Sequence, residues 1–112
     1  MSTAGDWCTV SWAPGKNGTA TVVISGEVDA ATVPLLEKAL AEAARAATGV
    51  LVVDVAGVTF MDAAGLRVLL GAQAEAANRR ARLRLAHVSA SVQRLFTAAG
   101  VQDRFRDAIR TE

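Results

Sequence analysis

Some segments of this chain have the spacing of hydrophobic and polar residues that is typical of strands, and others have the spacing that is typical of helices. The segments WCTVSWA and TATVVISGEV are rich in Val, Thr and Trp, and they flank the turn residues of PGKNG. Two such segments joined by Pro, Gly and Asn predict a β-hairpin. We therefore expect an antiparallel pair over residues 7–26, preceded by a flexible N-terminus at residues 1–6.

The spacing then becomes helical. Over ATVPLLEKALAEAARAA, residues 31–47, apolar side chains recur every three or four positions and charged side chains occupy the other faces. Pro34 is compatible with this helix because it falls in the first turn, where no intrahelical donor is needed. The predicted buried face consists of Val33, Leu36, Leu40, Ala43 and Ala47.

The remaining pattern alternates strands with helices. VLVVDV, residues 50–55, is almost continuously apolar, which is typical of a central strand. The elements expected after it are a helix, an alternating strand, a helix stopped by Gly100 and a short edge strand: residues 63–78, 82–88, 91–99 and 104–110. The core-facing residues expected on these two helices are Leu66, Leu69, Leu70, Ala77, Val92, Leu95, Phe96 and Ala99.

This order of elements predicts an α/β fold with a mixed sheet of four to five strands and three main helices. Its parallel neighbours require right-handed crossovers. A chain of 112 residues with 52% hydrophobic content can bury one core, and no repeat or linker divides it. We expect a single domain over residues 7–112.

Composition excludes several classes of function. With 12 basic and 11 acidic residues the net charge is +1, so no large field favours nucleic acid or an anionic membrane. The densest basic run, Arg79, Arg80, Arg82 and Arg84, lacks interleaved aromatic residues and is interpreted as a solvated face. One cysteine, no apolar span and no signal peptide predict a cytoplasmic protein without membrane insertion.

Residues that could carry catalysis are few: one His, one Cys and no Tyr. A triad could combine His87 and Asp54 with Ser25 or Ser89, but no nucleophile-elbow motif marks either serine. Cys8 has no basic neighbour to lower its pKa and is interpreted as a small strand hydrophobe. We expect no catalytic residue, and a small-molecule enzyme remains the alternative from another class.

Metal and cofactor binding are not expected either. Asp54 and Asp62 could together hold a hard cation, but we favour a backbone hydrogen bond for Asp54 and a helix cap for Asp62. A phosphoacceptor receiver domain would need a lysine late in the chain, whereas the only lysines are Lys16 and Lys38.

Two segments, VVISGEVDAATVPLLEKAL and VLVVDVAGVTFMDAAGLRVLL, resemble the STAS domain and, within it, the bacterial anti-sigma factor antagonists. The resemblance covers about residues 7–110. It implies a protein that, when unphosphorylated, binds an anti-sigma factor, often a serine kinase with an ATP site, and thereby frees a sigma factor. It also implies the fold predicted above.

In this family the phosphorylated serine directly follows the acid that matches Asp62. Here Ala63 occupies that position, and Ala64 replaces the next serine. Three interpretations stay open. The protein is an antagonist that is always in its binding state, or it is a STAS module that has another partner or is regulated in another way, or the alanine is an engineered replacement of a serine. Thr59 is a substitute acceptor in principle, although we favour an ordinary polar residue leaving the strand.

The resemblance also implies a docking surface. Its partner would be an anti-sigma factor, in our interpretation a serine kinase, bound by a monomer or a weak homodimer. The alternative of the same kind is a STAS subunit of a lipid- or anion-transport complex. The residues carried over to the docking surface are Glu27, Val28, Asp29, Ala30, Met61, Asp62, Ala63, Ala64, Gly65 and Arg67.

Overall fold

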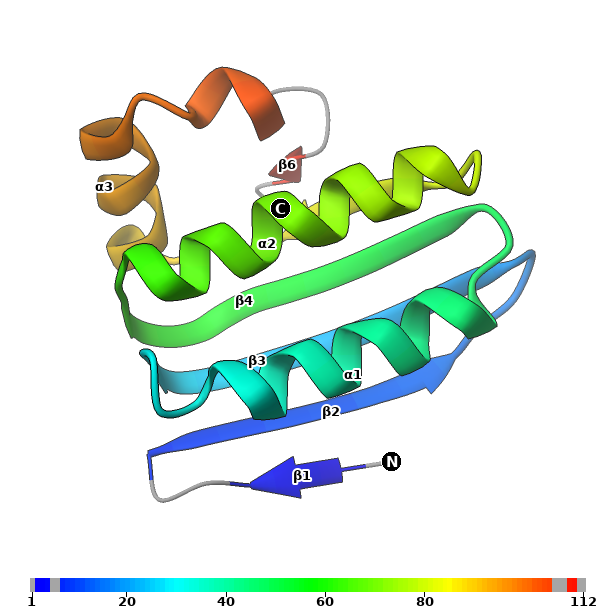
Figure 1. The fold of residues 1–112 in the computed structure, drawn as a ribbon, viewed down its shortest axis with the longest axis horizontal. Coiled ribbons are helices and arrows are strands. Elements are labelled where there is room, and N and C mark those ends of the chain that lie inside the picture. The colour runs from blue at the N-terminus through cyan, green and yellow to red at the C-terminus, as the bar shows by residue number, and fades with distance from the viewer. Residues whose placement is uncertain (1, 5–6, 106–108, 111–112) are drawn as a thin grey trace.

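A single mixed sheet forms the centre of the molecule, and its six strands are neighbours in the order of the chain (Figure 1). The computed structural model describes residues 2–4, 7–105 and 109–110. The α/β class, with a mixed sheet and three main helices, is confirmed. The strands are β1 (Ser2–Ala4), β2 (Cys8–Pro14), β3 (Thr19–Val28), β4 (Val50–Met61), β5 (Arg82–Ala86) and β6 (Ile109–Arg110). The helices are α1 (Val33–Ala46), α2 (Ala63–Asn78), α3 (Ala90–Ala99) and a short 3-10 helix (Gln102–Phe105).

The predicted hairpin is present as β2 and β3. In its turn the Gly15 amide donates to the Thr19 carbonyl at 2.7 Å. Asn17 and Gly18 adopt φ angles of 58° and 76°, in the left-handed region that these two residue types tolerate. The strands from β3 to β6 then run parallel to one another, as expected for strands connected through helices.

The two edges of the sheet differ from the sequence-based prediction. Residues 2–4, assigned to a flexible terminus, pair with β2 as the antiparallel strand β1, because β2 would otherwise present unpaired backbone groups. At the other edge, only residues 109–110 of the predicted strand form β6. Gln102–Phe105 forms the 3-10 helix instead, and residues 106–108 lie outside the described residues.

Strand β4 is longer than predicted, since it continues from Val55 to Met61. Its register with β3 shifts twice: Val23 pairs with Asp54, Ser25 with Gly57 and Glu27 with Phe60. Each shift inserts one extra residue into β4, which breaks the alternation of buried and exposed positions. Because β4 extends to Met61, Asp54 lies within the strand and not at its end. Its carboxylate accepts a hydrogen bond from the Ala56 amide at 3.0 Å.

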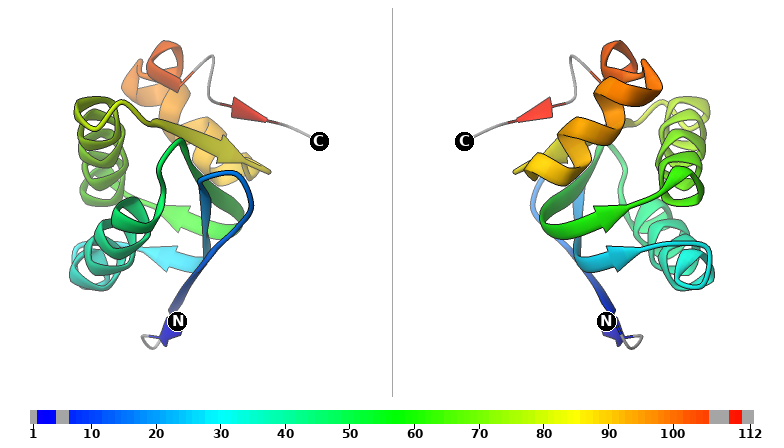
Figure 2. Two further views of the ribbon diagram at one scale, coloured as in Figure 1. Left: turned by 90° about the vertical axis from the view of Figure 1, so that its right-hand side faces the viewer. Right: turned by 90° about the vertical axis from the view of Figure 1, so that its left-hand side faces the viewer.

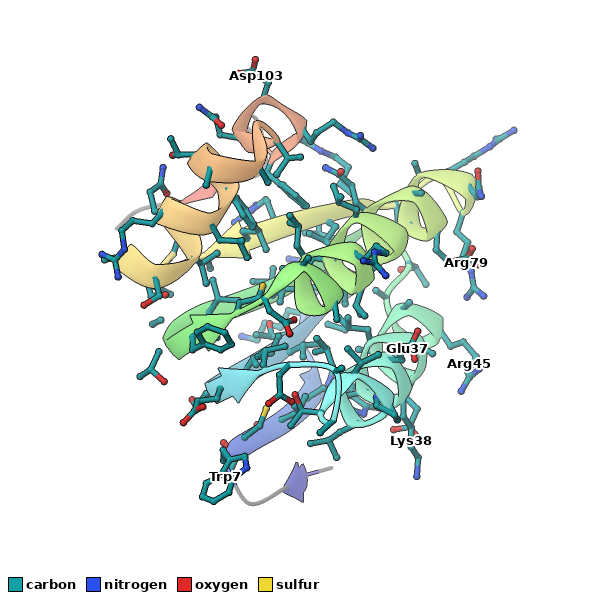
Figure 3. All side chains as sticks on the ribbon, turned by 60° about the vertical axis from the view of Figure 1, so that its left-hand side comes forward. Trp7, Glu37, Lys38, Arg45, Arg79 and Asp103 are labelled. Atoms are coloured by element: carbon teal, nitrogen blue, oxygen red, sulfur yellow. The ribbon has the colours of Figure 1, made fainter. Side chains whose placement is uncertain are left out.

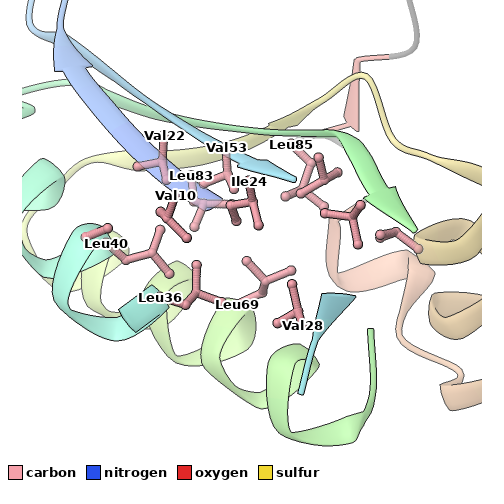
Figure 4. Close-up of a cluster of buried hydrophobic side chains, with 14 of the residues drawn as sticks. Val10, Val22, Ile24, Val28, Leu36, Leu40, Val53, Leu69, Leu83 and Leu85 are labelled. Carbon is pink, nitrogen blue, oxygen red and sulfur yellow. The ribbon is translucent and has the colours of Figure 1, made fainter. Parts of the chain in front are cut away.

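Helices α1 and α2 lie side by side over one face of the sheet, and the core lies between them and the strands (Figures 2 and 4). Leu36 of α1 and Leu69 of α2 are fully buried, as predicted. The prediction for Ala77 was wrong, because Ala76 is buried instead. At 3.6 residues per turn, position 76 lies about 20° from Leu69 around the helix, whereas position 77 lies about 80° away.

Helix α3 and the 3-10 helix pack on the side of the molecule farthest from β1 (Figures 1 and 2). The hydroxyl of Ser89 accepts a hydrogen bond from the Val92 amide at 3.4 Å, and Gly100 ends the helix at φ 69°. Phe96 stacks on Phe105 with ring centroids 5.0 Å apart, and both rings are buried. Ala99, predicted to be buried, is exposed in the last turn.

Candidate functional site

Two loops lie side by side where β3 and β4 end and α1 and α2 begin (Figure 1). The pairing of Val28 with Met61 brings the strand ends together, and the Asp62 amide donates to the Val28 carbonyl at 3.1 Å. Loops that follow parallel strands meet at one edge of a sheet, where such folds commonly place their binding sites. The two segments carried over by the sequence resemblance are therefore neighbours in space.

The first loop is held by a reciprocal pair of side chains, Asp29 and Thr32. The Asp29 carboxylate accepts hydrogen bonds from the amides of Ala31 at 3.0 Å and Thr32 at 3.2 Å. The Thr32 hydroxyl in turn accepts from the Asp29 amide at 2.9 Å. Thr32 is 6% exposed, whereas Asp29 is half-buried. Sequence reasoning missed Thr32, although an acid three residues before it at a helix start resembles a capping pattern.

The second loop ends in a capped helix. The Asp62 carboxylate accepts from the Ala64 amide at 3.0 Å and the Gly65 amide at 3.2 Å, which confirms the predicted helix cap. A Cβ atom at Gly65 would lie 2.7 Å from Val28 Cγ1 and 2.8 Å from Met61 Cγ. Glycine at this position therefore lets the start of α2 approach the two strand ends closely.

The carried-over residues divide into a buried set and a surface set. Val28, Met61 and Gly65 are buried, so they support the loops instead of contacting a partner. Asp29, Asp62 and Ala64 are half-buried. The exposed members are Glu27, Ala30, Ala63 and Arg67.

The surface of the two loops is acidic. We call Glu27, Asp29 and Asp62 the acidic corner. Within the described part of the chain, none of these carboxylates forms an ion pair. Their charge is therefore available to a basic group on a partner, at a place where backbone hydrogen bonds already fix two of the three side chains.

A groove of about 530 Å³ runs between α1 and α2 and joins the acidic corner through Ala64 and Arg67. Its walls are mostly small and apolar, with Glu37 and Glu75 among the charged residues that line it. The sequence did not predict this groove, because it depends on how two helices separated by a strand lie against each other. The remaining lining residues are Val33, Leu40, Ala41, Ala44, Val68, Gly71 and Ala72.

The residues considered for catalysis are not brought together. His87 is exposed just after β5, and no hydrogen bond among the described residues links it to Ser25, Ser89 or Asp54. Cys8 is 2% exposed; burial first, and the nearby charge of Asp29 second, raise the pKa of its thiol.

Across residues 2–4, 7–105 and 109–110, no group of three or more His, Cys, Asp or Glu side chains could hold a metal ion. Within the same ranges, none of the helices has the length and apolar character needed to cross a bilayer.

The cap of α2 gives a stability prediction for the site. Asp62→Ala should lower the free energy of unfolding by about 1 kcal/mol, because two amides at the start of α2 lose their acceptor. Asp62→Asn is the matched control, since asparagine keeps the acceptor and removes the charge. Urea denaturation of both variants measures the difference. Equal losses in the two variants would assign the effect to charge and not to capping.

Comparisons with known proteins agree with this geometry. The family model described as "Mlab, STAS domain" matches residues 13–110. The anti-sigma-B factor antagonist of Listeria monocytogenes serovar 1/2a is 34% identical over 83 residues, which cover 73% of this chain and 72% of the relative.

Solved structures share the fold. An anti-sigma factor antagonist from Mycobacterium paratuberculosis superposes with a TM-score of 0.81 at 23% identity, covering 98% of this chain and 91% of that one. The anti-sigma factor antagonist SpoIIAA in its unphosphorylated form gives a TM-score of 0.73 at 20% identity, covering 90% and 85%. By its family model and its relatives, this chain belongs to the STAS domain family and, within it, to the anti-sigma factor antagonists.

Proposed function

We propose that this protein acts in the cytoplasm as an anti-sigma factor antagonist: as a monomer it binds an anti-sigma factor, a serine kinase, and thereby releases a sigma factor. The docking surface is the acidic corner together with Ala30, Ala63, Ala64 and Arg67. The observation that carries the proposal is the joining of the two loops, in which Asp62 caps α2 and also bonds to Val28 at the end of β3.

The geometry of this surface suits recognition of another protein. The side chains of Asp29 and Asp62 are held by backbone hydrogen bonds, so these two lose little conformational entropy when a partner binds. The two loops rest on buried apolar residues of the strand ends. No residue in this surface has an assigned catalytic task, and the proposed role needs none.

We also propose that the binding state is permanent, because Ala63 has no acceptor atom for a phosphate. The side chain of Ala63 is exposed in the first turn of α2, directly after the capping carboxylate. A phosphate there would add about −1.5 to −2 charges beside Asp62. The positive end of the helix could accommodate this charge, but a partner matched to the present surface would meet additional negative charge.

Affinity capture tests the proposed partner. The tagged protein, incubated with a cytoplasmic lysate of the source organism, should retain a kinase-like anti-sigma factor that mass spectrometry identifies. The purified pair should then bind in isothermal titration calorimetry, and adding this protein to an anti-sigma–sigma complex should release the sigma factor. Retention of subunits of a lipid or anion transporter, with no sigma release, would favour the alternative function.

Kinase assays test the permanent state. With the captured kinase and ATP, the wild-type protein should gain no phosphate, whereas Ala63→Ser should gain one at residue 63. Ala64→Ser is the matched control, because it adds a hydroxyl one position away at a half-buried site. Phosphorylation of Thr59 in the wild-type protein, followed by release of the partner, would contradict the permanent state without affecting the partner assignment.

A further inference from the structure

Two aromatic side chains are exposed beside the acidic corner. Trp7 is 62% exposed and Phe60 is 48% exposed, and both belong to the small group of exposed large hydrophobic residues in the described chain. Figure 3 shows Trp7 projecting outward near the start of β2. Exposed aromatic residues of this size are typical anchors of protein interfaces.

Glu27 lies between these two aromatic residues. Its amide donates to the Trp7 carbonyl at 2.9 Å, and in the parallel register it pairs with Phe60. Neighbouring strands lie about 4.8 Å apart, so the Trp7 and Phe60 backbones flank Glu27 at about that distance on either side. We call Trp7, Glu27 and Phe60 the aromatic row.

The three side chains of the aromatic row leave the sheet on the same side. Glu27 and Phe60 are paired residues of β3 and β4, and they directly precede the buried residues Val28 and Met61. Trp7 lies just before β2 and directly precedes the buried residue Cys8. Trp7, Glu27 and Phe60 are exposed whereas the residue after each of them is buried, so the aromatic row faces solvent and not the core.

The backbone that presents the aromatic row is tightly constrained. Gly26 has a φ angle of 95°, and a Cβ atom there would lie 1.9 Å from the carbonyl oxygen of Trp7. Only glycine allows β2 and β3 to approach this closely next to the bulge. The position of Trp7 relative to Glu27 is therefore a fixed feature of the fold.

We infer that the aromatic row binds an arginine side chain of the anti-sigma partner; this inference rests on the proposed function. The Glu27 carboxylate can accept two hydrogen bonds from a guanidinium group, and the flanking rings offer faces on which that planar group stacks. A lysine ammonium fits less well, because it is compact and strongly hydrated and has no plane to stack. The acidic corner continues the same charge toward α2, which adds attraction for a basic partner.

Calorimetry with the partner tests this inference. Trp7→Ala and Phe60→Ala should each weaken binding about 10- to 30-fold, as expected for aromatic anchors. Glu27→Gln should weaken binding about 10-fold and reduce its dependence on salt. Val23→Ala is the matched control, because Val23 is an exposed apolar residue of β3 outside the aromatic row, and its replacement should leave affinity unchanged. Unchanged affinity in all three variants, with wild-type binding intact, overturns the inference and leaves the proposed function standing.

A second measurement needs no partner. We would titrate the 15N-labelled protein with Nα-acetylarginine methylamide and follow the indole Nε1–H signals by NMR. The Trp7 signal should shift, and the shift should be smaller with the lysine analogue and in Glu27→Gln. The Trp12 signal is an internal reference, because its indole donates to Glu42 Oε1 at 3.1 Å. Equal shifts with both analogues overturn the preference for arginine.

Two further measurements test whether the aromatic row binds something other than an arginine side chain. A blue shift of Trp7 fluorescence with phosphatidylglycerol vesicles would assign the row to a membrane. Sedimentation showing a dimer that Trp7→Ala dissociates would assign it to a second copy of the chain. Either result overturns the inference, whereas no partner binding by the wild-type protein would instead reject the proposed function.

Discussion

Replacing Leu69 with alanine should lower the free energy of unfolding by about 2 to 5 kcal/mol. Leu69 is 0% exposed, and its side chain lies between α2 and the sheet in the same cluster as Leu36, Ile24 and Val28 (Figure 4). Truncation removes apolar contacts and leaves a cavity that the surrounding side chains fill only in part. Urea denaturation followed by circular dichroism measures the loss, provided that the transition remains two-state.

The control for this prediction lies on the same helix. Arg67 is exposed and forms no ion pair with a described side chain, so Arg67→Ala should leave the free energy of unfolding nearly unchanged. It should nevertheless weaken partner binding, because Arg67 lies at the junction of the acidic corner and the groove. A loss of stability in Arg67→Ala as large as that in Leu69→Ala would mean that the assigned face of α2 is wrong.

The second large effect is expected at Ala63. Ala63→Glu should weaken the complex with the anti-sigma partner by about 1 to 3 kcal/mol, because a new carboxylate beside Asp62 adds charge where the partner docks. Ala63→Gln has nearly the same size without the charge and should weaken the complex less. Calorimetric titration of both variants separates the contribution of charge from that of size.

Two controls accompany this experiment: one for the place of the new charge on α2, and one for the stability of each variant. Ala77→Glu places the same change on an exposed site of α2, about 21 Å along the helix from residue 63, and should not change affinity. Melting curves for each variant show whether α2 remains folded. If Ala63→Glu binds as tightly as the wild-type protein, the docking surface lies elsewhere on the molecule.

The sequence by itself determined those features that depend on local chemistry. The turn at PGKNG, the helical spacing of Leu36 and Leu40, the carboxylate before α2 and the glycine after α3 each act within a few residues. Local hydrogen bonds and backbone preferences fix such features wherever the segment lies. For the same reason the hairpin, the three helices and the Asp62 cap were predicted correctly.

The tertiary structure decided what depends on pairing between distant segments. The continuation of β4 to Met61 requires bulges against β3, and these interrupt the alternation that marks a strand in the sequence. The short strand β1 forms only because β2 offers an unpaired edge. The groove between α1 and α2 depends likewise on the placement of two helices that a strand separates in the chain.

The candidate site shows the same division. The family resemblance located Asp29, Asp62 and Ala63 in the sequence. Neither the bond from Asp62 to Val28 nor the position of Trp7 beside Glu27 is visible in the sequence, because each joins residues at least 20 positions apart. A sheet brings such residues together through backbone pairing, so the surface they share exists only once the strands have aligned.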